Sequence, residues 1–146
     1  MNPGAYKKYN QVQIKTANRS KLVVLLYQGA IRFMKKSILL IEQKDMEGKG
    51  KALIRAQDII LELTYALDQD LLSKNDPLTQ NLQRLYLYSY RRLLHANLHL
   101  ESEPIEEVIK IMQGLLSAWE QVVDGNPDEN VESDPDIGEI RLGLTG

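Results

Sequence analysis

The sequence predicts an all-α protein, an antiparallel up-and-down four-helix bundle with an N-terminal arm and a disordered acidic C-terminal tail. Residues that end helices cluster at four places along the chain, at residues 44–50, 73–77, 101–104 and 124–127. Between these places, apolar residues recur every three or four positions, which is typical of amphipathic helices and not of strands. Helices of about 20 residues joined by short connections run antiparallel to one another.

Each of the four segments has an apolar stripe with helical spacing. On the first helix, which we expect to begin after Asn18, the stripe is Leu22, Leu26, Gly29, Phe33 and Leu40. The second helix has Leu53, Ala56, Ile60, Leu63, Leu67 and Leu71, and the third has Leu78, Leu82, Leu85, Leu93, Ala96 and Leu100. The fourth has Ile105, Val108, Met112, Leu115, Trp119 and Val122. We expect the four stripes to form one core.

Three of the predicted helices are preceded by a residue that can cap them. The side-chain oxygens of Asn18, Asp76 and Ser102 can each accept a hydrogen bond from an unpaired amide of the first helical turn. Pro77 directly follows Asp76, and proline is well tolerated there because the first turn needs no amide from it. These residues support helix starts near residues 18, 76 and 102.

The length of 146 residues predicts a single folded domain, residues 18–124, between an arm formed by residues 1–17 and a tail formed by residues 125–146. Residues 124–146 hold seven of the 20 Asp and Glu residues but one of the 18 Lys and Arg residues, so this end has a net charge of −6 and the rest of the chain has +4. The tail composition is typical of disorder. A charge of +4 is too small for a duplex-binding domain, and we expect no nucleic-acid partner.

The composition also bears on location. The sequence has no cysteine, which excludes disulfides and thiolate metal sites. The first residues lack the apolar segment of a signal peptide, and the longest apolar runs, such as Leu22 to Tyr27, are much shorter than a membrane-spanning helix. We expect a cytoplasmic protein without stable membrane insertion.

Few polar residues have spacings that catalysis or metal binding would require. His95 and His99 are four residues apart, as in a two-histidine metal site, but without further ligands we interpret them as partly exposed histidines. Asp58 and Glu62 have the same spacing, and we interpret them as the solvated side of their helix. Gly48-Lys49-Gly50 fits a turn better than a phosphate-binding loop. We therefore expect no enzymatic activity, no catalytic residue, no cofactor and no metal ion.

The predicted helices carry more apolar residues than one core can hide. The first helix has, off its stripe, Val23, Val24, Leu25, Tyr27, Ala30, Ile31, Met34, Ile38, Leu39 and Ile41. The second adds Ile54, Ile59, Leu61 and Tyr65, and the third adds Tyr86, Leu87, Tyr88, Tyr90, Leu94 and Leu98. Contiguous exposed apolar patches usually mark interaction sites, and tyrosine suits them because its ring packs while its hydroxyl stays hydrated. The surplus predicts a protein-binding surface; the alternative is that the arm and the tail cover these residues.

A series of short motifs runs from about Ala5 to Val123. It includes Ala5-Tyr6, Tyr9 to Val12, Leu25 to Ala30, Gly48 to Leu53, Ala56 to Ile60, Leu85 to Tyr88, Arg91 to Leu98 and Ala118-Trp119. In this order and spacing the motifs resemble those of the FliS-type flagellar secretion chaperones. The resemblance implies a bundle that binds the disordered C-terminal segment of flagellin, prevents its premature polymerisation, and delivers it to the export gate of the flagellar secretion apparatus.

The resemblance also implies which residues contact this client. Tyr6, Tyr9, Val12 and Ile14 correspond to an N-terminal arm that covers part of the binding surface until flagellin displaces it. Leu26, Tyr27 and Ala30 belong to the family's first-helix motif, and Ile59, Leu63, Leu85, Tyr86 and Asn97 fall in its middle helices, where client contacts are expected. The alternative function is a non-enzymatic structural or regulatory bundle that self-associates, as a homodimer in the absence of client, or binds another flagellar protein.

The acidic tail leads to one more hypothesis. Its apolar residues include Ile137, Ile140, Leu142 and Leu144. A coil of about 22 residues has a root-mean-square span near 25 Å, so these residues can reach the bundle's own client-binding groove and mimic the client. The alternative is that the tail is a solubilising extension.

Overall fold

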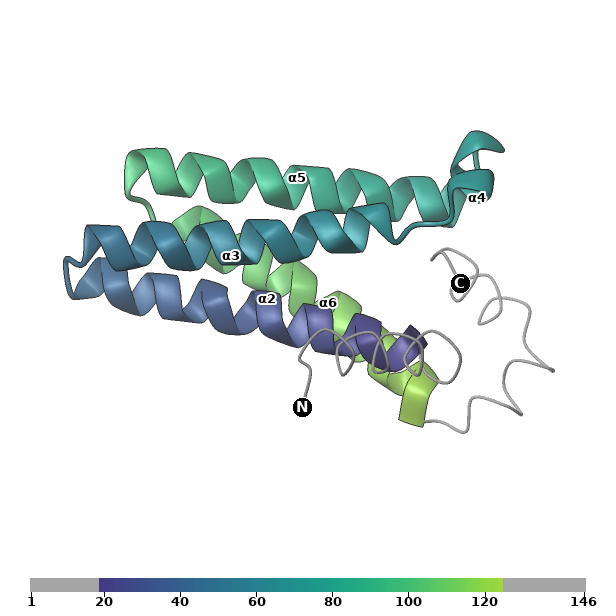
Figure 1. Cartoon of the computed structure of the whole chain (residues 1–146), viewed down its shortest axis with the longest axis horizontal. Coiled ribbons are helices and arrows are strands. Elements are labelled where there is room, and N and C mark those ends of the chain that lie inside the picture. Colours follow the sequence, from purple (N-terminus) through teal and green to yellow (C-terminus); the bar gives the residue numbers. More distant parts are fainter. Residues whose placement is uncertain (1–18, 125–146) are drawn as a thin grey trace, which may run out of the picture.

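The computed structural model of the protein describes residues 19–124. The helices are α2 (Arg19–Glu42), α3 (Met46–Tyr65), the short α4 (Gln69–Ser73), α5 (Pro77–His99) and α6 (Glu103–Asp124). The four long helices form an antiparallel bundle in which α2 and α5 each pack against both α3 and α6 (Figure 1). The predicted all-α bundle is therefore confirmed, while the arm, the tail and the predicted cap Asn18 lie outside the described residues.

Aspartate side chains cap three of the helices. Asp76 accepts hydrogen bonds from the Thr79 amide at 3.0 Å and the Thr79 hydroxyl at 2.7 Å, and Pro77 is the first residue of α5, as predicted. Asp45 caps α3 by accepting the Gly48 amide at 2.9 Å. Each cap satisfies an amide that has no partner within its helix.

The second predicted helix is interrupted. Instead of continuing through Leu71, α3 ends at Tyr65, and α4 begins after Asp68, whose side chain accepts the amides of Asp70 and Leu71 at 2.9 and 3.1 Å. Such bonds compete with helix continuation because they engage amides that would otherwise donate to the preceding turn. The prediction of one unbroken helix was wrong at this point, although Leu67, within the break, is fully buried as expected.

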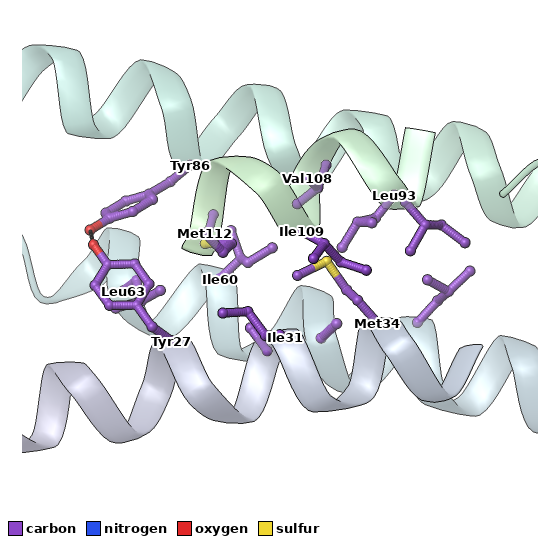
Figure 2. Close-up of a cluster of buried hydrophobic side chains, with 14 of the residues drawn as sticks. Tyr27, Ile31, Met34, Ile60, Leu63, Tyr86, Leu93, Val108, Ile109 and Met112 are labelled. Carbon is purple, nitrogen blue, oxygen red and sulfur yellow. Dashed lines mark hydrogen bonds between the residues drawn. The ribbon is translucent and has the colours of Figure 1, made fainter. Parts of the chain in front are cut away.

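The core lies between the four long helices, and Figure 2 shows part of it. Most residues of the stripes predicted for α3 and α6 lie in the core, since Leu53, Ala56, Ile60 and Leu63, and likewise Ile105, Val108, Met112 and Trp119, are buried. Leu71 and Leu115 are only partly buried, and Val122 is not among the residues whose burial is described. Burying one large apolar side chain contributes about 1.5–3 kcal/mol. A continuous core of this kind is what holds the helices together.

The stripe predicted for the first helix was wrong by about one residue. The core side of α2 consists of Val23, Tyr27, Ala30 and Met34, which are at most 3% exposed. One residue corresponds to a rotation of about 100° around a helix. The predicted stripe instead lies toward α3: a Cβ atom at Gly29 would be 3.3 Å from Cδ1 of Ile59.

The end of α5 also differs from the prediction. The helix ends at His99, and Leu100 adopts a left-handed conformation with φ of 57°, its amide donating to the Ala96 carbonyl. Leu100 is half exposed, so its assignment to the core was wrong. No helix within residues 19–124 is long and apolar enough to cross a membrane.

Candidate functional site

Apolar side chains that are exposed, or partly exposed in the case of Leu61, form one row on α3 and another on α5. The α3 row consists of Ile54, Leu61 and Tyr65, and the α5 row of Leu87, Leu94 and Leu98. The most exposed members are Tyr65 at 72% and Leu98 at 71%. Within each row the residues are seven and four positions apart, so they share one side of their helix.

Polar contacts between α3 and α5 place the two rows next to each other. Lys49 near the start of α3 bonds Asn97 near the end of α5, and further along Nε2 of Gln57 donates to the Tyr90 carbonyl at 3.4 Å. Ile54 and Leu61 are three and four residues from Gln57, and Leu87 and Leu94 are three and four residues from Tyr90. Both rows therefore border the contact between the helices, and we call these six apolar residues the α3–α5 surface.

The contact between Lys49 and Asn97 fixes one end of this surface. Nζ of Lys49 donates to the carbonyl oxygen of Asn97 at 3.0 Å and to its Oδ1 at 2.6 Å, and Lys49 is 4% exposed. The last carbonyls of a helix have no intrahelical partner and carry a partial negative charge. Lys49 of α3 therefore caps the C-terminal end of α5.

Two charged residues interrupt the apolar rows. Asp58 lies between Ile54 and Leu61, and Arg91 lies between Leu87 and Leu94; both are exposed. An apolar surface between two helices, with a carboxylate and a guanidinium at defined positions, suits an amphipathic helix, which would lay its apolar side on the rows and direct polar groups to the charges.

The residues predicted as partner contacts occupy three different environments. Those of the arm, Tyr6, Tyr9, Val12 and Ile14, lie outside the described residues. Tyr27, Ala30, Leu63 and Tyr86 are fully buried, so in this conformation they are core residues with no surface to offer a partner. Leu26, Ile59, Leu85 and Asn97 are partly buried. The α3–α5 surface contains none of them, but all six of its residues are in the surplus of apolar residues identified from helical spacing.

Tyr27 and Tyr86 form a buried polar pair across the core. Their hydroxyl groups are hydrogen-bonded to each other (Figure 2). Burial raises the pKa of Tyr27 to about 12, although the Tyr86 hydroxyl and the nearby side chain of Trp119 partly oppose the rise. Burial, and then the proximity of Tyr27, raise the pKa of Tyr86 well above its ordinary value. Both tyrosines are therefore neutral at physiological pH.

A second polar cluster links α5 to α6. Nε of Arg92 lies 2.8 Å from Oε1 of Glu107, and the Tyr88 hydroxyl lies 2.9 Å from both carboxylate oxygens. The bonds from Arg92 and then Tyr88 lower the pKa of Glu107. Tyr88, though partly exposed, is engaged in this link and lies on the side of α5 that faces α6.

The groups weighed for catalysis or metal binding are isolated from further ligands. The imidazole rings of His95 and His99 stack with centroids 4.2 Å apart, and Nε2 of His95 lies 3.4 Å from Oε2 of Glu101. Asp58 and Glu62 are both exposed on α3. Within residues 19–124, no group of three or more His, Cys, Asp or Glu side chains has the arrangement of a metal site.

Comparison with known proteins connects this architecture to one family. Residues 1–126 match the family described as "Flagellar protein FliS". The chain is 37% identical over 121 residues to the "Flagellar secretion chaperone FliS" of Salmonella typhimurium, which covers 80% of this chain and 87% of that protein. It is 34% identical over 118 residues to the protein of the same name in Bacillus subtilis, covering 81% and 85% of the two chains. A third relative, from Campylobacter jejuni, is 33% identical over 118 residues, covering 81% and 90%.

Proposed function

Because this chain belongs to the FliS family of flagellar proteins, we propose that it is a cytoplasmic chaperone that binds the disordered C-terminal segment of flagellin and delivers it to the export gate of the flagellar secretion apparatus. The relatives named above are flagellar secretion chaperones, and membership of such a family argues against an enzymatic activity. The observation that supports client binding most directly is the α3–α5 surface, where apolar side chains on two adjacent helices are left exposed.

The proposed mechanism follows from this surface. A client segment that forms an amphipathic helix buries its apolar side against Ile54, Leu61, Leu94 and their neighbours. While it is bound, the same side of the client is unavailable for contacts between flagellin subunits. Covering that side prevents premature polymerisation, and release at the export gate makes it available again.

Other residues have subsidiary places in this proposal. The arm residues Tyr6, Tyr9, Val12 and Ile14 cover part of the apolar surface before flagellin displaces them. The partly buried residues Leu26, Ile59, Leu85 and Asn97 extend the contact where the client passes beyond the α3–α5 surface. In the absence of client, two copies of the chain associate through the same apolar residues.

Calorimetric titration with a C-terminal flagellin peptide tests the proposal. The variant Leu98→Asp places a charge in the exposed row of α5, whereas Leu39→Asp makes the same change at an exposed leucine of α2. Losing the burial of one leucine costs about 1.5–3 kcal/mol, which weakens binding about tenfold to a hundredfold. We expect this loss for Leu98→Asp and wild-type affinity for Leu39→Asp.

Several results would contradict the proposal at different levels. If the peptide produces neither heat nor a shift in elution volume, the chain is not a flagellin chaperone. Equal weakening by the two variants would mean that the α3–α5 surface is not the specific contact. A dimer that the peptide fails to dissociate would separate self-association from client binding.

A further inference from the structure

A second hollow, chemically different from the α3–α5 surface, lies between α2 and α3 near their connecting turn. Its volume is about 410 Å³. Phe33, Leu40 and Ala52 form an apolar floor. Lys36, Lys51 and Arg55 supply cations around it, and Asp45 supplies one carboxylate. We call it the α2–α3 groove. It borders the side of α3 that faces α2, whereas the α3–α5 surface borders the side that faces α5.

The positive charge at this groove is only partly neutralised by the bundle itself. Lys51 is 3.3 Å from Glu47, and the Asp45 carboxylate accepts the Gly48 amide. Within residues 19–124, Lys36 and Arg55 have no carboxylate within 4.0 Å.

Phe33 at the groove floor lies between two arginines. The guanidinium carbons of Arg55 and Arg32 lie 5.2 and 5.9 Å from the centroid of its ring. Of the two, Arg55 lines the groove, and it is not paired to a carboxylate in the described part of the chain. A cation beside an aromatic ring favours an occupant that brings negative charge together with apolar side chains.

The C-terminal residues of this chain have that composition. The segment from Asp134 to Leu144 alternates acidic residues with apolar ones, namely Asp134, Asp136, Ile137, Glu139, Ile140, Leu142 and Leu144, and contains a single cation, Arg141. The family match ends at residue 126, so this segment lies outside the matched residues. We propose that residues 134–144 dock in the α2–α3 groove of the same molecule, with the acidic residues at Lys36, Lys51 and Arg55 and the isoleucines on the floor.

The path from the last helix to the groove has a suitable length. A hollow between α2 and α6 is lined by Ile31 and Lys35 of α2 and by Gln113 and Leu116 of α6. The two helices are antiparallel, so α6 ends beside the first turns of α2 (Figure 1). At 1.5 Å per residue, Phe33 and Lys36 lie about 20 Å further along α2. The 13 residues from Asp124 to Ile137 span about 20 Å as a coil.

Tethering compensates for a weak contact. A segment on a linker of this length has an effective concentration of order millimolar, so a site with a millimolar dissociation constant is about half occupied. The earlier hypothesis placed the tail in the client-binding groove. The charges instead direct it to the α2–α3 groove, because the rows of the α3–α5 surface contain one carboxylate, Asp58, and one cation, Arg91.

Paramagnetic relaxation in the full-length protein tests the docking. Because the chain lacks cysteine, the variant Thr145→Cys accepts a single nitroxide label. At low salt we expect amide signals of Lys36, Leu40 and Ala52 to lose intensity, and the loss to diminish as salt shortens the range of electrostatic attraction. Mixing labelled chains with unlabelled, isotopically enriched chains should give no loss, since the contact is intramolecular.

Charge reversal supplies the matched controls. The double variant Lys36→Glu with Arg55→Glu should abolish the loss of signal intensity. The control double variant Arg84→Glu with Lys110→Glu changes the net charge by the same amount on the exposed surface of α5 and α6, and the intensity loss should remain. Adding Asp136→Lys and Glu139→Lys to the first double variant should restore the intensity loss.

Three results would overturn the proposal: no signal loss in the groove, loss centred on the α3–α5 surface, or loss in the mixed sample, which would indicate a second copy. The flagellin titration does not depend on these outcomes, so either proposal can fail without the other.

Discussion

The buried tyrosine pair allows a quantitative test of how the core is specified. Tyr86→Phe leaves the Tyr27 hydroxyl without its buried partner, and Tyr27→Phe leaves the Tyr86 hydroxyl without its partner in the same way. Since an orphaned buried group costs about 1–3 kcal/mol, we expect each single change to destabilise the fold by about 1–3 kcal/mol.

The double variant separates this explanation from a general loss of packing. With both hydroxyls absent, neither is left without its partner, so the double change should cost less than the sum of the single changes. Urea unfolding followed by circular dichroism measures all three free energies. Single-variant effects that add to within about 0.5 kcal/mol would refute the coupling, because independent sites show that degree of additivity.

The pH dependence provides a second measurement on the same pair. The pKa of Tyr27 is raised to about 12 in the folded protein, and that of Tyr86 is also raised. A raised pKa means that the neutral form is favoured by folding, so this contribution is complete below about pH 10 and is lost as the pH rises toward 12 and beyond. Above pH 10 the stability should fall by about 1.4 kcal/mol per pH unit for each tyrosine, and the double Phe variant should lack this part of the slope.

Two further predictions concern single residues. Lys49→Met leaves the Asn97 carbonyl at the end of α5 without its buried cation, and we expect it to lower the free energy of unfolding in urea by about 1.5–3 kcal/mol. The control Lys51→Met breaks an exposed ion pair and should cost at most about 0.5 kcal/mol. Equal costs would show that Lys49 does not cap α5. Gly114→Ala adds a methyl group where no atom lies within 4 Å and should raise stability by about 0.5–1 kcal/mol. At Gly48 the same change would place Cβ 2.6 Å from the capping Asp45 carboxylate and should lower the melting temperature.

Sequence patterns identified the core side of α3 correctly because polar residues such as Lys51, Arg55 and Glu62 interrupt the apolar residues on its other sides. The same reasoning failed on α2, where apolar residues surround much of the helix and two stripes one residue apart satisfy the same periodicity. What selects between them is non-local: the Tyr27 hydroxyl meets Tyr86, 59 residues away in the sequence. Tyr86 was assigned to the surface because no local pattern shows that a tyrosine hydroxyl has a buried partner elsewhere in the sequence.

For the candidate site, the residues selected by helical spacing and those selected by motif correspondence lie in different places. The surplus of apolar residues contained every member of the α3–α5 surface, because more apolar side chains than a core can hold must leave some exposed. Motif correspondence selected Tyr27, Ala30, Leu63 and Tyr86, which are buried. A family motif marks positions that the fold requires as well as positions that a partner requires, and the sequence of one chain does not separate the two.

The contacts between α3 and α5 explain why apolar side chains are left over on these helices. Lys49 bonds Asn97 and Gln57 bonds Tyr90 along the line where the helices meet, so polar groups fix the position of the two helices relative to each other at that outer edge. Leu94, Leu98 and Ile54, on either side of this line, are therefore not needed to close the interface. An apolar surface that is not buried in the folded bundle can be covered and uncovered by a partner without altering the bundle. Reversible binding of a client requires such a surface.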